Sequence, residues 1–434
     1  MKIAVIGAGI SGLTAAYYLN SYHQVSVFES TAKIGGHTAT VDIEHNGQQF
    51  AIDTGFIVFN DWTYPNFIKL MDELSVDSKS TEMSFSVRCE NTGIEYGGNN
   101  LNTMFAQRRN IFRPTFHKMI RDILRFNREA IRDLDDGNIS ETITLNEYLK
   151  ANHYGEAFIY QYILPMGCAI WSASTEKMVD FPLLFFVQFF KNHGLLSVSN
   201  RPQWRVIKGG SGSYLGPLTS SFKDSIFTNC NIKKIRRLGD SVELVMADNE
   251  VMVYDHVVLA CHSDQALALL SDATRAEQES LLAIPYQQND VVLHTDENLL
   301  PRNRIAWSSW NYRLFDRVQS RAVLTYNMNI LQGIQSDTTF CVTLNATEAI
   351  DESKIIKQFS YSHPVFSLDS VVAAKKIESI NGSNHTWFAG AYLGNGFHED
   401  GVVSGRHVAT LINRLSGLRT ARQKEGLTEA VVSA

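Results

Sequence analysis

The sequence predicts an α/β fold in which a discontinuous nucleotide-binding domain is joined to a region of antiparallel sheet and helices. The apolar run at 2–6 leads directly into the glycine-rich turn GAGISG at 7–12, which opens a helical pattern. A second apolar run at 25–28 ends in Glu29, close to the ~20 residues that separate such a turn from a ribose-binding acid. A buried-strand pattern recurs at 257–261, far along the chain. These observations indicate a Rossmann domain whose pieces are separated in the sequence.

Each glycine of the turn has a distinct predicted role. Gly7 permits the tight turn, Gly9 keeps side-chain atoms away from a pyrophosphate, and Gly12 lets the helix pack close to the strand. The phosphates are then expected at the positive N-terminus of that helix. We expect Glu29 to hold ribose hydroxyls; the alternative is a surface acid that follows an ordinary β-α-β unit.

The remaining sequence divides by its hydrophobic spacing. Residues 61–200 show mostly helical spacing, and residues 285–382 alternate between apolar and polar side chains, as strands of an antiparallel sheet do. The polar residues 417–434 are expected to fray. The nucleotide-binding domain is therefore assigned to three pieces, 1–60, 201–284 and 383–416.

Composition narrows the class of protein. A chain of 434 residues with 44% apolar residues is long enough for two or three domains and a large buried cofactor. A net charge of −6 argues against a nucleic-acid partner. The five cysteines lack CxxC spacing, so we expect neither disulfides nor a metal site. We expect a cytoplasmic protein, because no apolar run is long enough to span a bilayer and the first strand leaves no room for a signal peptide.

Several sequence words extend the pattern beyond the glycine turn. They are VIGAGISGL, KIGGH, DTGFIVFN, PMGCAIWS, VIKGGSGSY, LHTDENLLP, AWSSWNY and FAGAYLGNGFHEDGVVSG. With these words the chain resembles bacterial NAD(P)/FAD-binding proteins of the flavin amine-oxidoreductase superfamily and, more distantly, phytoene desaturases and protoporphyrinogen oxidase. It is also similar to a subgroup that desaturates methyl-branched fatty acyl chains of phospholipids on the route to furan fatty acids. The resemblance implies a glutathione-reductase-like FAD-binding domain and non-covalent FAD.

The resemblance also implies which residues contact the cofactor. A helix that starts near Gly401 is expected to direct its N-terminal amides at the pyrimidine end of the flavin. Two positions depart from the family: Ala391 and its neighbours replace the acid that amine oxidases carry after Phe-Ala-Gly, and His37 replaces an arginine of many relatives. The full cofactor set is Gly7, Gly9, Gly12, Glu29, Lys33, Gly35, Gly36, Thr54, Gly55, Ile232, Gly390, Asp400, Gly401 and Val402.

Three residues are candidates for a role in catalysis. His398, beside the expected flavin segment, is a candidate base or ring-positioning group, or else a satisfied structural histidine. Trp171 and Tyr392 are candidates to frame the flavin face, with ordinary aromatic packing as the alternative. His262 and His294 have weaker claims. The phenylalanine-rich run at 181–190 is either the wall of an acyl tunnel or the core face of one helix.

A basic amphipathic stretch between 107 and 132 predicts a contact with anionic lipid. Its arginines, Arg121, Arg125 and Arg128 among them, alternate with apolar residues. The alternative is a solvated face of a helix packed on its own domain. The lipid interpretation places the protein at the inner face of the cytoplasmic membrane.

Together these patterns and the resemblance imply an FAD-dependent enzyme that removes two hydrogens from a lipid acyl chain, a methyl-branched fatty acyl group of a membrane phospholipid, by hydride transfer to flavin. The sequence leaves open the electron acceptor, the double-bond position and a homodimeric state. The rival interpretations are a soluble amine oxidase, a carotenoid- or porphyrin-type desaturase, and a non-catalytic flavin-binding redox sensor or scaffold.

Overall fold

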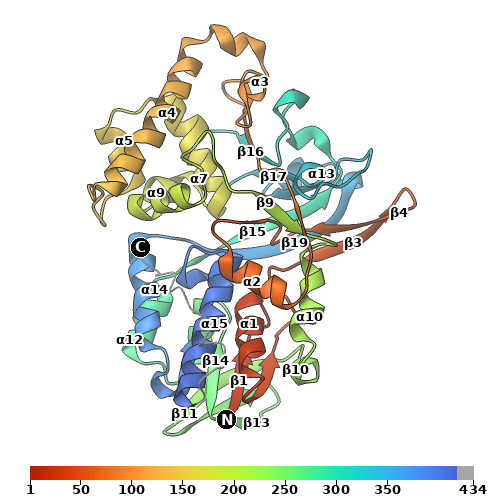
Figure 1. Ribbon diagram of the computed structural model, residues 1–434, viewed down its shortest axis with the longest axis vertical. Coiled ribbons are helices and arrows are strands. Elements are labelled where there is room, and N and C mark those ends of the chain that lie inside the picture. Colours follow the sequence, from red (N-terminus) through yellow and green to blue (C-terminus); the bar gives the residue numbers. More distant parts are fainter. Residues whose placement is uncertain (418–434) are drawn as a thin grey trace.

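The computed structural model describes residues 1–417. Figure 1 shows a lower part around β1, β14, α1 and α15 and an upper part that contains α4, α5, α7 and α9, with β15 and β19 running between them. The expected tail at 417–434 lies, apart from Gly417, outside the described residues. Among residues 1–417, no helix is both long and apolar enough to cross a membrane.

A five-stranded parallel sheet forms the centre of the lower part. Its strand order is β10-β2-β1-β14-β20, and every pair is parallel. The central strands are buried on both faces, which explains their continuous apolar runs. This sheet confirms the α/β fold and the discontinuous Rossmann domain. Its strands are β1 (Lys2–Ile6), β2 (Gln24–Phe28), β10 (Ile226–Phe227), β14 (His256–Leu259) and β20 (Thr386–Phe388).

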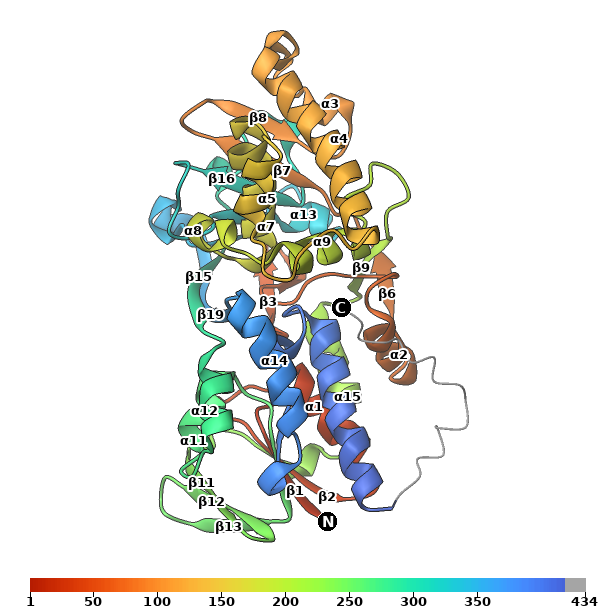
Figure 2. The same ribbon diagram turned by 90° about the vertical axis from the view of Figure 1, so that its left-hand side faces the viewer.

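Helices cover this sheet, and α1 (Ile10–Leu19) crosses α15 (His398–Leu415) at close range. Glycines make the crossing possible: a Cβ on Gly401 would lie 2.6 Å from a methyl of Ile10, and one on Gly405 would overlap the Ser11 carbonyl oxygen. Figure 2 shows α14 alongside α15. The other covering elements are α11 (Ser263–Leu269), α12 (Arg275–Leu282), α14 (Leu368–Ile380) and the antiparallel strands β11 (Ile232–Leu238), β12 (Ser241–Met246) and β13 (Val251–Tyr254).

The second sheet has seven strands and lies between the nucleotide-binding domain and the helices of the upper part. Its order is β19-β15-β18-β17-β16-β7-β8, and all its pairs are antiparallel except β16 with β7. The strands are β7 (Phe85–Cys89), β8 (Ile94–Gly97), β15 (Tyr286–His294), β16 (Trp310–Leu314), β17 (Leu324–Asn327), β18 (Cys341–Leu344) and β19 (Ile355–Pro364).

Two of the predicted regions contain elements that the sequence did not assign to them. Strands β7 and β8 come from 61–200, which we predicted to be mostly helical, yet they complete the second sheet. Helix α14 comes from 285–382, yet its Ala373 and Ile377 pack with Ile235 and Leu281 of the nucleotide-binding domain. The alternation in Phe85-Ser86-Val87-Arg88-Cys89 was the signal for β7.

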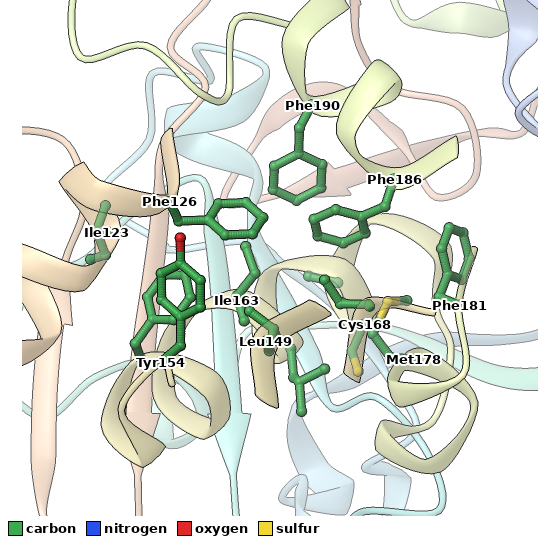
Figure 3. Packing of buried hydrophobic residues seen from close by; sticks show 14 of the residues in the cluster. Ile123, Phe126, Leu149, Tyr154, Ile163, Cys168, Met178, Phe181, Phe186 and Phe190 are labelled. Carbon is green, nitrogen blue, oxygen red and sulfur yellow. The ribbon is translucent and has the colours of Figure 1, made fainter. Parts of the chain in front are cut away.

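The upper helices pack around an aromatic core. Figure 3 shows Phe126 of α4 beside Phe186 and Phe190 of α9, and all three side chains are buried. Phe189, on another face of α9, instead lines the cavity described below. The phenylalanine-rich run therefore contributes Phe186 and Phe190 to the core and Phe189 to the cavity wall. The helices are α4 (Pro114–Asp135), α5 (Leu145–Ala151), α6 (Glu156–Phe158), α7 (Leu164–Trp171), α8 (Thr175–Val179) and α9 (Leu183–Asn192), with a π-helical turn at Ile159–Ile163.

Short elements join the two parts. A hairpin of β3 (Thr40–His45) and β4 (Gln48–Asp53) turns at Asn46 and Gly47, both with positive φ, as a type I′ turn requires. The other elements are β5 (Phe59–Asn60), α2 (Pro65–Glu73), β6 (Ser78–Ser80), α3 (Leu101–Met104), β9 (Trp204–Ile207), α10 (Leu215–Thr219) and α13 (Met328–Leu331).

Candidate cofactor and substrate site

One cavity of about 1760 Å³ connects the two parts of the molecule. At one end it is lined by Glu29 and Ile232 of the nucleotide-binding domain. At the other end it is lined by Ile123 and Asn127 of α4 and by Tyr162 of the π-helical turn. The cavity is large enough for a dinucleotide and a second molecule beyond it.

The glycine turn forms a cradle at the N-terminus of α1. A Cβ on Gly7, whose φ is +102°, would lie 2.7 Å from the Ala260 carbonyl oxygen, and one on Gly12 would overlap the Gly7 carbonyl oxygen. A Cβ on Gly9 would meet no atom within 4 Å, because this position faces the cavity. The cradle therefore leaves open the space that a diphosphate needs, next to free helix amides.

Glu29 ends β2 at the edge of this cradle. Its Oε2 accepts a hydrogen bond from the Ala8 amide (3.0 Å), and its Oε1 accepts one from the Thr31 amide (2.9 Å). These two bonds fix the carboxylate toward the cavity, where it can accept ribose hydroxyls. Ile232 and Lys33 line the same end.

The two loop segments predicted to contact FAD lie against the cradle. A Cβ on Gly36 would lie 3.2 Å from Gly9 Cα, and both Gly35 and Gly36 have positive φ. Gly55 lines the cavity, and its missing side chain lets the chain approach the His37 carbonyl oxygen. Thr54 does not line it: its hydroxyl lies 3.1 Å from that of Tyr361.

The C-terminal helix starts earlier in the sequence than predicted. Helix α15 begins at His398, three residues before Gly401, because the Asp400 carboxylate accepts a hydrogen bond from the Phe397 amide (2.8 Å) and caps the first turn. Burial raises the pKa of Asp400 to about 6. The predicted cofactor contacts Asp400, Gly401 and Val402 lie behind the cavity wall, whereas the predicted contact Gly390 and the catalytic candidate His398 line it.

His398 is a satisfied buried histidine. Its ring stacks on Phe56 with centroids 3.6 Å apart, and its Nε2 lies 2.9 Å from the Thr38 hydroxyl and 3.2 Å from that of Tyr214. Burial holds its pKa well below the ordinary value. This geometry favours a role in positioning the flavin ring over a role as general base.

The two aromatic candidates line the cavity in different ways. Trp171 donates from Nε1 to the Asn395 carbonyl oxygen (3.3 Å) and packs on Phe181 with centroids 4.5 Å apart, so it belongs to the aromatic core. The hydroxyl of Tyr392 is buried and has no hydrogen-bond partner within residues 1–417. Two further polar atoms of the cavity wall share this property, Nε2 of His37 and Nε1 of Trp310.

The two weaker histidine candidates lie in different parts of the structure. His262 lines the cavity, but His294 lies in the second sheet, with Nε2 2.7 Å from the Thr343 hydroxyl and Nδ1 accepting the Asp296 amide. Sequence reasoning missed Trp310 and His363 as lining residues. The word AWSSWNY was the signal for Trp310, and no local pattern marks His363.

The fold and this site define a flavoprotein of the glutathione-reductase type. The open space at Gly9, the carboxylate of Glu29 and the unpartnered polar atoms of the wall fit FAD, which accepts a hydride at its ring when bound. A model of the family described as flavin containing amine oxidoreductase matches residues 10–314. The chain belongs to this family and is an FAD-dependent oxidoreductase.

Solved structures share the whole architecture. Cyclohexylamine oxidase from Brevibacterium oxydans IH-35A superposes with a TM-score of 0.68 at 14% identity, covering 96% of this chain and 99% of that one. A putrescine oxidase bound to putrescine (TM-score 0.65, 15% identity, 95% and 99% covered) and a CLA-producing fatty acid isomerase from P. acnes (0.67, 16%, 95% and 98%) are similar too. At these identities the likeness establishes the fold. No curated protein matches the chain.

Proposed function

We propose that the protein dehydrogenates a lipid acyl chain, a methyl-branched fatty acyl group of a membrane phospholipid, by hydride transfer to its FAD. The observation that carries this proposal is the wall of the cavity beyond the cofactor end. That wall is mostly apolar and aromatic, as a site for a hydrocarbon chain must be, and Arg201 is a cation among the residues that line the cavity.

The side chains of this wall come from several elements. Hydrocarbon surface is supplied by Met166 and Ile170 of α7 and by Phe189 of α9. The polar residues Tyr162 and Trp310 carry no charge at neutral pH, whereas Arg201 does. Dehydrogenation requires a C–H bond held close to the flavin with water excluded, which such a wall provides.

The charge distribution separates this proposal from an amine oxidase. Among the described residues that line the cavity, the one carboxylate is that of Glu29, at the ribose end. An ammonium group buried beyond the flavin would therefore find no carboxylate partner, and burial of an unpaired cation is costly. The fatty acid isomerase from P. acnes supports the lipid proposal, because on this fold that protein acts on a fatty acid.

The α4 end of the cavity supports a membrane-bound substrate. Asn127 and Ile123 of α4 line the cavity, and the neighbouring positions of the same helix carry exposed Arg121, Leu124 and Arg128. We propose that these cations meet anionic headgroups while Leu124, 51% exposed, enters the interface. This arrangement would place the protein at the inner face of the cytoplasmic membrane.

Arg125 does not belong to this surface, contrary to the sequence prediction. Its guanidinium lies 3.9 Å from the ring centroid of Tyr154, donates to the Asn152 carbonyl oxygen (2.8 Å) and lies 3.5 Å from Glu129. These partners hold the side chain along its own domain. Arg125 therefore stabilises the packing of α4 instead of contacting lipid.

The decisive experiment mixes the FAD-loaded enzyme anaerobically with bacterial lipid extracts. We expect bleaching of the oxidised flavin and, by mass spectrometry, acyl chains two hydrogens lighter. The variant Met166→Trp, which narrows the apolar cavity, should lose this bleaching but keep its FAD and its reduction by dithionite. Leu282→Trp, on the exposed face of α12, is the matched control.

Each other result identifies a rival. Peroxide release with amines would replace the proposal by an amine oxidase, and bleaching by isoprenoid or porphyrinogen substrates alone would indicate a desaturase of that type. A flavin that no organic substrate reduces would indicate a redox sensor or scaffold.

A further inference from the structure

Three histidines from distant segments meet beside the phosphate cradle. His37 follows the Gly35-Gly36 pair, His262 precedes α11, and His363 lies near the end of β19; all three line the cavity. The ring centroid of His37 lies 5.3 Å from that of His363 and 6.5 Å from that of His262. Three imidazole rings therefore lie close together on the wall of one cavity.

The cluster lies close to the glycine turn. Gly36, which precedes His37, approaches Gly9 Cα, and the Ala260 carbonyl oxygen two residues before His262 packs against Gly7. The backbone that carries His37 and His262 therefore lies next to the glycine turn, and all three rings line the cavity that the turn opens into.

A relay of two asparagines fixes the tautomer of His363. Asn345 donates from Nδ2 to the Ala322 carbonyl oxygen (2.9 Å) and to Oδ1 of Asn289 (2.8 Å), and its own Oδ1 accepts the Asp290 amide (3.1 Å). Asn289 is thereby oriented with its Nδ2 toward Nδ1 of His363, at 3.3 Å. Nδ1 accepts this bond, so the ring proton of His363 lies on Nε2, which becomes a donor.

The rings of His37 and His262 are positioned by hydrogen bonds of their own backbones, and that of His262 also by stacking. The carbonyl oxygen of His37 accepts the Phe56 amide (2.7 Å), and Nε2 of its ring is buried without a partner in the described chain. His262 stacks on Tyr286 with centroids 4.2 Å apart and an interplanar angle of 10°, and its amide donates to Oε1 of Gln265 (3.2 Å).

The surroundings keep the cluster uncharged until an anion arrives. Burial first, and then the neighbouring imidazoles, lower the pKa of His37 to about 3 and that of His363 to about 4. The titratable groups that face the cluster from the packed elements are Asp264 of α11, Tyr286 of β15, Tyr361 of β19 and His398 of α15. Asp264 alone among them is acidic, so a phosphate would be the main negative charge beside these rings.

We propose that His37, His262 and His363 form an imidazole clamp for the diphosphate of FAD, and that FAD binding is coupled to the uptake of protons by this clamp. Neutral His363 offers an Nε2–H donor, and any of the three rings that takes up a proton becomes a charge-assisted donor. The inference is independent of the organic substrate, because it concerns the apoprotein and its cofactor.

The test titrates the apoprotein with FAD and with riboflavin, which lacks the diphosphate. His37→Gln and His363→Gln should each weaken FAD binding about tenfold or more, the loss expected for a charge-assisted hydrogen bond, and leave riboflavin binding within about twofold. His407→Gln, an exposed histidine of α15, is the matched control and should change neither. Circular dichroism of each apoprotein verifies its fold.

Proton uptake is measured separately, by calorimetry of FAD binding in buffers of different ionisation enthalpy. We expect net uptake in the wild type, tighter binding at lower pH, and loss of both in His37→Arg, whose fixed cation should still hold FAD. Equal weakening of riboflavin and FAD, or FAD binding without proton uptake in the wild type, would overturn the clamp.

Discussion

Two glycines of the same turn should respond to alanine in opposite ways. In Gly9→Ala the new methyl group points into the open cavity, so the apoprotein should keep its free energy of unfolding within about 1 kcal/mol, the usual range for N-cap substitutions. FAD affinity should fall at least about tenfold, because the methyl group occupies diphosphate space and removes a close amide contact. In Gly12→Ala the methyl group overlaps the Gly7 carbonyl oxygen, and relief of that overlap separates helix from strand at a cost of about 3 kcal/mol.

The assay pairs urea unfolding of the apoproteins with fluorescence titration by FAD. The pattern to look for is a stable Gly9→Ala protein that has lost FAD and a destabilised Gly12→Ala protein. An apoprotein of Gly9→Ala as unstable as that of Gly12→Ala would refute the geometry, as would wild-type FAD affinity in Gly9→Ala.

Further predictions concern α4 and α15. Replacing Arg121 and Arg128 together by serine should weaken sedimentation with anionic vesicles, and added salt should abolish the difference; unchanged sedimentation contradicts the membrane surface. Arg125→Ala should instead lower the melting temperature and leave vesicle binding intact, because its partners are internal. Asp400→Asn should stabilise the protein above pH 6. The pKa of Asp400 is raised from 3.8 to about 6 in the fold. Its protonated carboxyl therefore makes its full contribution to the free energy of unfolding below pH 3.8, and this contribution is lost as the pH rises through about 6. Urea unfolding at pH 4 and pH 7 checks this, and equal stability of the two proteins at both values contradicts it.

The nucleotide-binding core was predictable because its signals are local. The glycine turn, the strand before it and Glu29 lie within the first 29 residues, and each role depends on neighbours in the sequence. The pairing of β7 with β16 was not predictable in the same way. Phe85 pairs with Trp310 across more than two hundred residues, and alternation alone does not name a partner strand.

The start of α15 shows a different limit. Glycine at 401 suggested a helix boundary, but Gly401 serves the crossing with α1, and the cap is provided by Asp400 as the third residue of the helix. A glycine in a sequence can mark a turn or a close contact between helices, and only packing distinguishes the two. The displaced boundary moved three predicted cofactor contacts behind the cavity wall.

Three consecutive residues of α4 explain why the substrate end resisted prediction most. Phe126 is buried in the aromatic core, Asn127 lines the cavity, and Arg128 is exposed. Helical periodicity assigns these residues to different faces, but it does not say whether a half-polar face meets solvent, lipid or a cavity. That information comes from what packs against the helix.

The same reasoning distinguishes Arg121 and Arg128 from Arg125, although the sequence alone treats the three as equivalent. A cation can bind an external partner only where its side chain is not already bound within its own domain.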